Sequence, residues 1–441
     1  TSSGGESVPT KHVVWRGEPT PRVPMTTEAR ISTWSRRFVV AGVGWLVVWQ
    51  LLATVDSGTV VAGSSTVRFD LPRRAAVPLG LGGFVFHVVF GKAYSLIPSY
   101  FERQLATHRL LPVHFSLTTL GVAGLGVGPV VGSRVASGLG ALAWFGGVTV
   151  FVGTLVYSIR DNVDGAETGT GTAKSHLRAT DRVANAFVPV VFGYLLLGSY
   201  ALLASSLAGL SSAVLPGFGG VPFLLDGYPP RSTHLLAAGS AALLIFSVGS
   251  RLLPRFFVAT PPVWLTRVTL ALGAVAPGLL AWGLPSGTAL RVGAALEAGA
   301  VVGYATLVVT LRRRSDRDRV GFDGVLAGAL SGVIGVLLGL SFAFGRVDAA
   351  LATVHFRVNV LGFLGTTIVG LLFQFYPPAV GTRVGVSDRT ARVALGAIAV
   401  GLLFEVVAGL AGESLLVLTG RGLELVGVVS AGYLVVDVAA E

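Results

Sequence analysis

The sequence predicts an all-α membrane protein with twelve transmembrane helices in three four-helix repeats. Of its 441 residues, 52% are hydrophobic and only 12% are charged, and the mean hydropathy is +0.74. Soluble domains carry about 25% charged residues, so this composition excludes an ordinary soluble fold. A helix needs about 20 apolar residues to cross the hydrocarbon core. Apolar runs of that length occur at 38–60, 76–98, 111–133, 137–158, 185–208, 233–254, 263–284, 288–311, 324–345, 353–376, 391–412 and 415–437.

The repeat is predicted by a skeleton that occurs in the second, sixth and tenth apolar runs. Each copy has a glycine fifteen positions before a proline and a second small residue seven positions before the same proline. Internal similarity of this kind indicates repeated structural units. Because the copies lie four runs apart, we expect four helices per repeat and a pseudo-threefold arrangement. The copies are Gly83, Gly91 and Pro98; Gly239, Ser247 and Pro254; and Gly362, Gly370 and Pro377.

The repeats divide the chain into units of similar length. The polar N-terminal segment has no apolar period, so we expect a tail that is disordered or lies against a partner. A Gly- and Thr-rich stretch after the fourth run predicts a flexible connection. The predicted units are a cytoplasmic tail at 1–37, repeat 1 at 38–160, a linker at 161–184, repeat 2 at 185–312, a linker at 313–323 and repeat 3 at 324–441.

Basic residues are distributed unevenly between the two sides of the predicted bundle. Lys and Arg gather in the N-terminal segment and in the loops after even-numbered runs, and the opposite loops hold far fewer. Cytoplasmic loops carry such an excess, so we expect a multi-pass cell-membrane protein with both termini in the cytoplasm. The net charge of +11 is thus a topology signal, and nothing indicates nucleic-acid binding. The absence of cysteine excludes disulfides, thiolate metal sites and cysteine catalysis.

Two histidines mark a candidate cofactor site. His234 and His355 lie at the same depth, about one turn inside the outer ends of the sixth and tenth runs. Ionisable residues inside a membrane are expensive and usually functional. Neutral imidazole is the usual protein ligand of heme iron or copper, so the pair is a candidate metal site. The alternative is that each ring only hydrogen-bonds a carbonyl or a water near the interface.

Further ionisable residues within the runs define a possible proton or polar path. His87 needs a buried partner, for which His114 of the third run is a candidate. Lys92 is expected to extend towards the cytoplasm rather than to carry protons. Glu297, in the eighth run, either carries protons or pairs with an arginine. Arg421 and Glu424 are three residues apart, which predicts a structural ion pair on one helix face.

The tenth run resembles the tenth span of heme-copper oxidase subunit I, closest to the C-family. The likeness covers Val354–Pro377, with His355, the two glycines of the skeleton, an aromatic residue and the terminal proline at matching spacing. The stretch from His234 to Pro254 is similar to the sixth span of that family. The resemblance implies the twelve-span, pseudo-threefold fold, with His355 as the high-spin heme ligand and His234 as a copper ligand.

The departures from that family narrow the expected function. Arg357 stands where the family has the second histidine of a His-x-His pair, and Ala76 stands where its low-spin partner falls. The two further copper histidines are missing from the segment 281–286, so no copper is expected. The residues that do match the family imply a single heme b between the sixth and tenth runs, with His355 as its ligand and Arg357 near a propionate or another anion. His234 would either ligate the iron directly or act as a distal hydrogen-bond donor to a bound diatomic molecule. The alternative for Arg357 is a guanidinium that extends to the interface.

Three functions are therefore left open. The first is electron transfer, or NO or O2 binding, beside a partner redox subunit and without complete oxygen reduction. The second is a cofactor-free structural or assembly subunit of a respiratory membrane complex. The third is a transporter that uses the intramembrane His, Lys and Glu residues, which is disfavoured because the repeats are not inverted.

Overall fold

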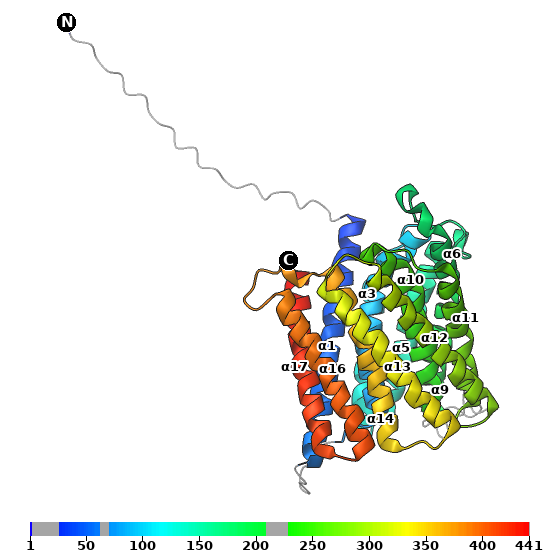
Figure 1. Ribbon diagram of the computed structural model, residues 1–441, viewed down its shortest axis with the longest axis vertical. Coiled ribbons are helices and arrows are strands. Elements are labelled where there is room, and N and C mark those ends of the chain that lie inside the picture. Colours follow the sequence, from blue (N-terminus) through cyan, green and yellow to red (C-terminus); the bar gives the residue numbers. More distant parts are fainter. Residues whose placement is uncertain (2–25, 62–69, 209–227, 441) are drawn as a thin grey trace.

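The predicted helical membrane architecture is confirmed. The computed structural model describes residues 1, 26–61, 70–208 and 228–440, and within these ranges it is helical with no strand. Its described part contains 12 helices that are long and apolar enough to cross a membrane (Figure 1). Each lies within a few residues of a predicted run, except at the first and fifth, which begin earlier.

Of the spans that the structure describes, eight are single α-helices, and one is made of two consecutive α-helices. The fifth span combines α6 (Arg178–Ala186) with α7 (Val188–Ala208). The single helices are α1 (Thr27–Val61), α4 (Leu111–Val130), α5 (Arg134–Ile159), α11 (Val263–Gly283), α12 (Thr288–Arg313), α13 (Val320–Phe344), α16 (Asp388–Ala411) and α17 (Ser414–Ala440).

The second, sixth and tenth spans are compound, because each contains a π-helical segment between two α-helices. Segments of this kind often occur at functional sites. The second span consists of α2 (Arg73–Val77), η1 (Pro78–Phe86) and α3 (His87–Tyr100). The sixth consists of α9 (Pro229–His234), η4 (Leu235–Ala242) and α10 (Leu243–Phe257), and the tenth of α14 (Ala349–Arg357), η5 (Val358–Gly365) and α15 (Thr366–Phe375).

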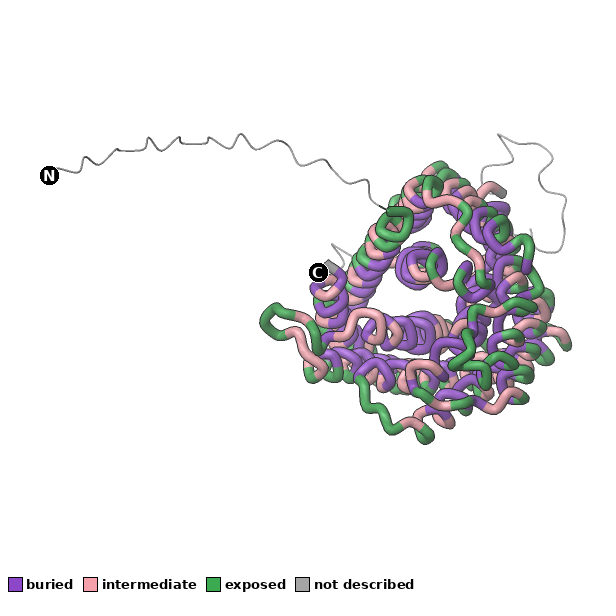
Figure 2. Tube along the Cα trace, turned by 90° about the horizontal axis from the view of Figure 1, so that it is seen from above, coloured by how far each residue is buried: buried purple, intermediate pink, exposed green. Residues whose placement is uncertain are grey.

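These three spans form the inside of the bundle. About 83%, 83% and 78% of their apolar windows are buried, against 33–50% for the other nine. The three π-helical segments contact one another. Seen along the helix axes, buried residues face inward and exposed residues lie along the outer rim (Figure 2). The outer helices therefore present apolar surface to lipid, and the inner three are enclosed by protein.

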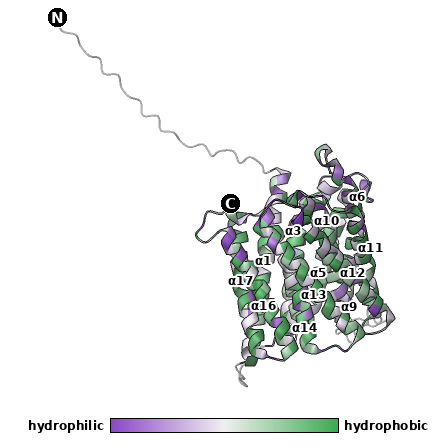
Figure 3. Ribbon diagram, in the orientation of Figure 1, coloured by the Kyte–Doolittle hydropathy of each residue, from purple (hydrophilic) through white to green (hydrophobic). Residues whose placement is uncertain are grey.

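The outer surface matches the dimensions of a bilayer. Trp264 and Trp282 are both about two-thirds exposed and mark the two ends of α11. At 1.5 Å per residue they are roughly 27 Å apart, close to the thickness of the hydrocarbon core. Tryptophan favours the two interfaces of a bilayer. Hydrophobic residues cover the middle of the bundle, and strongly hydrophilic residues gather towards its ends (Figure 3).

The small residues of the repeated skeleton share one structural role, which is close contact with the preceding span. A Cβ at the first glycine of each copy would meet a side chain there: Gly83 against Trp45 at 2.8 Å, Gly239 against Tyr194 at 2.6 Å and Gly362 against Ser331 at 2.9 Å. The second small residues behave alike: Gly91 approaches Ser35 O, Ser247 donates to Ala184 O, and Gly370 approaches Gly321 O. The three copies of the skeleton thus contact the preceding span in the same way, and the three-repeat arrangement and its boundaries stay predictions.

We expect Gly370→Ala to lower the unfolding temperature of the protein in detergent. The new Cβ would lie 2.6 Å from Gly321 O and 2.7 Å from Val325 N, both backbone atoms of α13. Overpacking of this kind costs about 1–3 kcal/mol. Gly396→Ala in α16 is the matched control, because nothing lies within 4 Å of the added atom. Equal unfolding temperatures for the two variants would show that α13 and α15 are not in tight contact.

Two of the predicted connections differ from the structure. Residues 27–37, expected to belong to the tail, form the first turns of α1, and residues 2–25 lie outside the described ranges. The linker at 161–184, expected to be flexible, packs against the bundle. Its Asp181 is fully buried and is paired with Arg255 at 2.6 Å and lies 3.9 Å from Arg251. The composition of this segment predicted a flexible chain, but the ion pair between Asp181 and Arg255 holds the segment against α10.

Candidate functional site

His234 and His355 face each other across one cavity, as their common depth predicted. Their ring centroids are 6.4 Å apart, and the two ring planes differ by 26°. His234 is the last residue of α9, directly before η4, and His355 lies in the last turn of α14 before η5. The compound geometry of both spans thus brings the two imidazoles together at the end of the bundle opposite the termini.

The hydrogen bonds of both rings fix the same tautomer. His234 Nδ1 lies 2.7 Å from Pro230 O, and His355 Nδ1 lies 2.9 Å from Gly335 O. A carbonyl oxygen only accepts, so each Nδ1 carries the proton and donates. Asn359 then donates to His355 O at 2.8 Å rather than to the ring. Each Nε2 keeps a lone pair, and neither nitrogen has a partner among the described residues. A metal-ligating histidine has this arrangement.

The cavity beside the two rings has a volume of about 970 Å³. Ligand pockets span roughly 300–1,000 Å³, so this volume is at the upper end of that range. Most of its wall is apolar, and Phe342 packs edge-on against His355 with ring centroids 5.6 Å apart. The apolar wall includes Leu236, Ala237, Val336, Phe342, Val360 and Phe363.

Glu297 of α12 lines the same cavity. Its side chain is buried, and Oε2 has no hydrogen-bond partner within the described part of the chain. Of the four residues assigned to a polar path, Glu297 is thus the one that shares a space with the histidine pair. A carboxyl group without a partner at this point can hold or release a proton inside the cavity.

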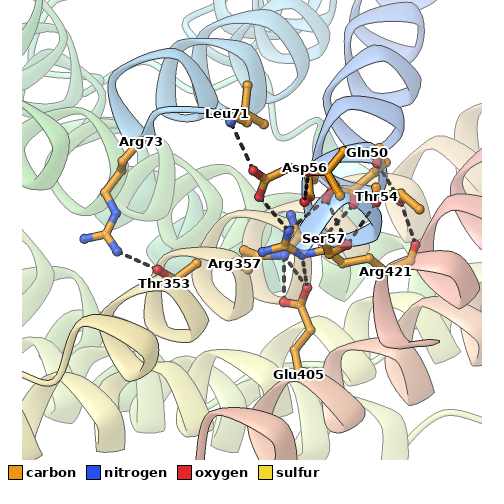
Figure 4. Close-up of polar contacts among 12 residues, drawn as sticks. Gln50, Thr54, Asp56, Ser57, Leu71, Arg73, Thr353, Arg357, Glu405 and Arg421 are labelled. Carbon is orange, nitrogen blue, oxygen red and sulfur yellow. Dashed lines mark hydrogen bonds and ion pairs between the residues drawn. The ribbon is translucent and has the colours of Figure 1, made fainter. Parts of the chain in front are cut away.

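Arginines at the mouth of the cavity were missed as site residues. Arg73, Arg74 and Arg134 line its outer part, and Arg73 donates to Thr353 Oγ1 at 2.8 Å, two residues before His355 (Figure 4). The sequence analysis counted them only as loop charges. The signal that points to them is position, because Arg73 and Arg74 begin the second span, which is one of the three inner spans.

Arg357 does not belong to this cavity, so its expected role beside a propionate is replaced. Its Nε donates to both carboxylate oxygens of Glu405, at 2.7 and 2.6 Å, and its Nη2 contacts Glu424 and donates to Gln50 at 2.9 Å. Trp49 packs over the guanidinium, 5.3 Å from ring centroid to Cζ. The group is buried rather than extended to the interface, and its charge is already neutralised.

Arg357 is part of a buried ionic cluster that joins α1, α14, α16 and α17 (Figure 4). Arg421 pairs with Glu405 at 3.0 Å and with Asp56 at 3.2 Å. The pair expected between Arg421 and Glu424 is therefore wrong in its partners. Both residues lie on the same face of α17, but the carboxylate of Glu424 contacts Arg357 of α14 instead.

His87 and His114 do not line the cavity, and both pack against the Phe38 ring, with centroid distances of 6.0 and 4.9 Å. His87 Nδ1 donates to Gly82 O at 2.9 Å, and its Nε2 accepts from Thr119 Oγ1 at 3.2 Å. His114 Nδ1 is hydrogen-bonded to Tyr94 OH at 2.8 Å. No hydrogen bond joins the two imidazoles within the described residues. Their contacts are those of structural residues in an aromatic core.

Lys92 is also separate from the histidine pair. Its Nζ donates to Tyr376 OH at 2.8 Å and lies 4.2 Å from the centre of that ring. Phe375 receives the same ammonium at 4.6 Å. The side chain thus connects the second span to the end of the tenth, instead of extending freely towards solvent.

The fold defines the class of protein: a helical, multi-pass integral membrane protein that lies in a lipid bilayer. Known protein-family models give no match to this chain, and neither do curated proteins.

Proposed function

We propose that this protein is a divergent relative of the heme-copper oxidase subunit I family that holds a single heme b between the sixth and tenth spans. The observation that carries the proposal is the pair of Nε2 lone pairs on His234 and His355. A metal bound to two such nitrogens at about 2 Å each separates the ring centroids by roughly 6 Å. The observed separation is 6.4 Å.

The number of protein ligands favours heme over a bare metal ion. A structural or catalytic ion such as zinc needs three or four protein ligands. No group of three or more His, Cys, Asp or Glu residues that could hold an ion occurs in the described part of the chain. Heme brings four nitrogens of its own, so His234 and His355 would be sufficient to hold it. Leu284 and Pro285, where the family's copper histidines are expected, reach the cavity without ligating atoms.

The cavity also suits the amphipathic shape of heme. Its deep wall is apolar, as a macrocycle requires, and the mouth carries Arg73 and Arg74 within reach of carboxylate groups. Arginine binds carboxylates through paired hydrogen bonds. These two arginines are therefore the proposed partners of the propionates, in place of Arg357.

Electron transfer is the activity that this arrangement favours. The heme supplies a one-electron redox centre when it is bound. The chain contributes the two imidazoles, an apolar wall that excludes water, and Glu297, which holds a proton close to the site. With both imidazoles engaged in holding the heme, the site would leave no position at which NO or O2 could bind. Complete oxygen reduction is not proposed, and a partner redox subunit would deliver or accept the electron.

Absorption spectroscopy of detergent-purified protein tests this proposal. We expect a Soret band, a sharp visible band after reduction, and no change when carbon monoxide is added. A carbon monoxide shift would move the proposed role from electron transfer to gas binding. A colourless protein without iron would contradict the heme and favour a cofactor-free structural or assembly subunit.

A further inference from the structure

We propose that the end of the bundle that carries the termini binds the phosphate headgroup of an anionic lipid. The site is a surface pocket of about 370 Å³ between the first turns of α1 and the loop that precedes α4. It is separate from the histidine cavity and independent of the proposed heme. Its lining is Arg30, Thr33, Trp34, Arg37, His108, Arg109 and Pro112.

The charge of the pocket is unbalanced. Three arginines and a histidine line it, and no acidic residue does. Arg30 Nη1 lies 3.5 Å from His108 Nε2, and Arg37 lies over the Trp34 ring at 4.4 Å. No ion pair joins Arg30, Arg37 or Arg109 to a carboxylate among the described residues. Cations held together without an anion repel one another, and a phosphate group relieves that repulsion with charge-assisted hydrogen bonds.

The depth of the pocket matches the headgroup layer. α1 has 35 residues and is therefore roughly 52 Å long, well beyond the hydrocarbon thickness. Its apolar part begins at Phe38, so Arg30, Trp34 and Arg37 lie on the turns that extend beyond the hydrocarbon. Tryptophan favours this depth. Basic residues close to the surface attract anionic lipids. A lipid is therefore the ligand that fits, with its phosphate in the pocket and its chains beside the first and third spans.

Native mass spectrometry of the full chain tests this site. The protein is delipidated in a neutral detergent and mixed with phosphatidylglycerol, phosphatidylcholine or soluble glycerol phosphate, and retained molecules are counted. We expect retention of phosphatidylglycerol above phosphatidylcholine. The triple variant Arg30→Gln, Arg37→Gln, Arg109→Gln should weaken phosphatidylglycerol binding by about tenfold or more, because each basic residue contributes separately.

A second triple variant is the control for charge. Arg313→Gln, Arg317→Gln and Arg319→Gln remove the same charge from the last residue of α12 and the connection that follows it, outside the pocket, and should leave lipid retention unchanged. Equal losses in both variants would overturn the proposal, because binding would then reflect overall charge. Displacement of the lipid by equimolar glycerol phosphate would also overturn it, because the acyl chains would contribute nothing.

Discussion

Replacement of His355 by alanine is expected to abolish the heme absorption of the purified protein. His355 supplies one of the two Nε2 lone pairs at the cavity, and Gly335 O holds its ring in place. We expect His355 to carry most of the heme affinity, because the heme ligand of the proposed family falls at this position and only a copper ligand falls at His234. The measurement is the Soret absorbance per chain after purification in detergent, compared with the unaltered protein.

Two further variants make this result specific. His234→Ala should convert six-coordinate iron to a five-coordinate form that binds carbon monoxide. His176→Ala alters an exposed histidine outside the cavity and should leave the spectrum unchanged. A full Soret band in the double variant His234→Ala, His355→Ala would contradict the assignment of the heme to this cavity.

Arg357→Met is expected to cause the largest loss of stability of any single substitution discussed. Arg357 is buried and contacts the carboxylates of Glu405 and Glu424. Removal of one partner from a buried ion pair leaves uncompensated charge and costs about 3–5 kcal/mol. The measurement is the thermal or denaturant unfolding of the detergent-solubilised protein.

A charge-balanced double variant separates charge from packing. Arg357→Met with Glu424→Leu removes one charge of each sign and leaves Arg421 with Glu405 and Asp56. We expect this variant to be more stable than Arg357→Met alone. Glu167→Ala breaks the exposed pair with Arg103 and should cost less than about 1 kcal/mol. If Arg357→Met unfolded like Glu167→Ala, the buried cluster would not stabilise the fold.

The spans and the histidine pair were predictable because their signals are local. Hydrophobic length determines where a helix crosses the bilayer, and the repeated small residues mark where each inner span touches the one before it. The positions of His234 and His355 within their apolar runs are enough to predict that both lie at the same depth in the membrane. Two spans with the same skeleton then bring both rings to one cavity.

The buried ionic cluster was not predictable, because its members come from distant parts of the chain. Arg357 could be placed at the correct depth, but its direction depends on which neighbour packs against each face of α14. The acceptors Glu405 and Glu424 lie on two other helices, and Gln50 lies on the first. Spacing within one helix suggested Arg421 with Glu424, and tertiary packing selected other partners.

The packing of residues 161–184 against the bundle was not predicted, for a similar reason. Residues 161–184 read as a flexible linker from their glycine and threonine content. One buried carboxylate, Asp181, ties the segment to Arg255 and places it near Arg251 on the sixth span. Local composition carries no information about such a long-range partner.

The number of hemes per chain is the most direct test of the account. In the proposed assignment the histidine pair would hold one heme, and Arg357, which stands where a second heme ligand would fall, is held in its ionic cluster. Pigment extraction and quantification against protein concentration should therefore give one heme b for each chain. A value of zero, or of two, would contradict the account.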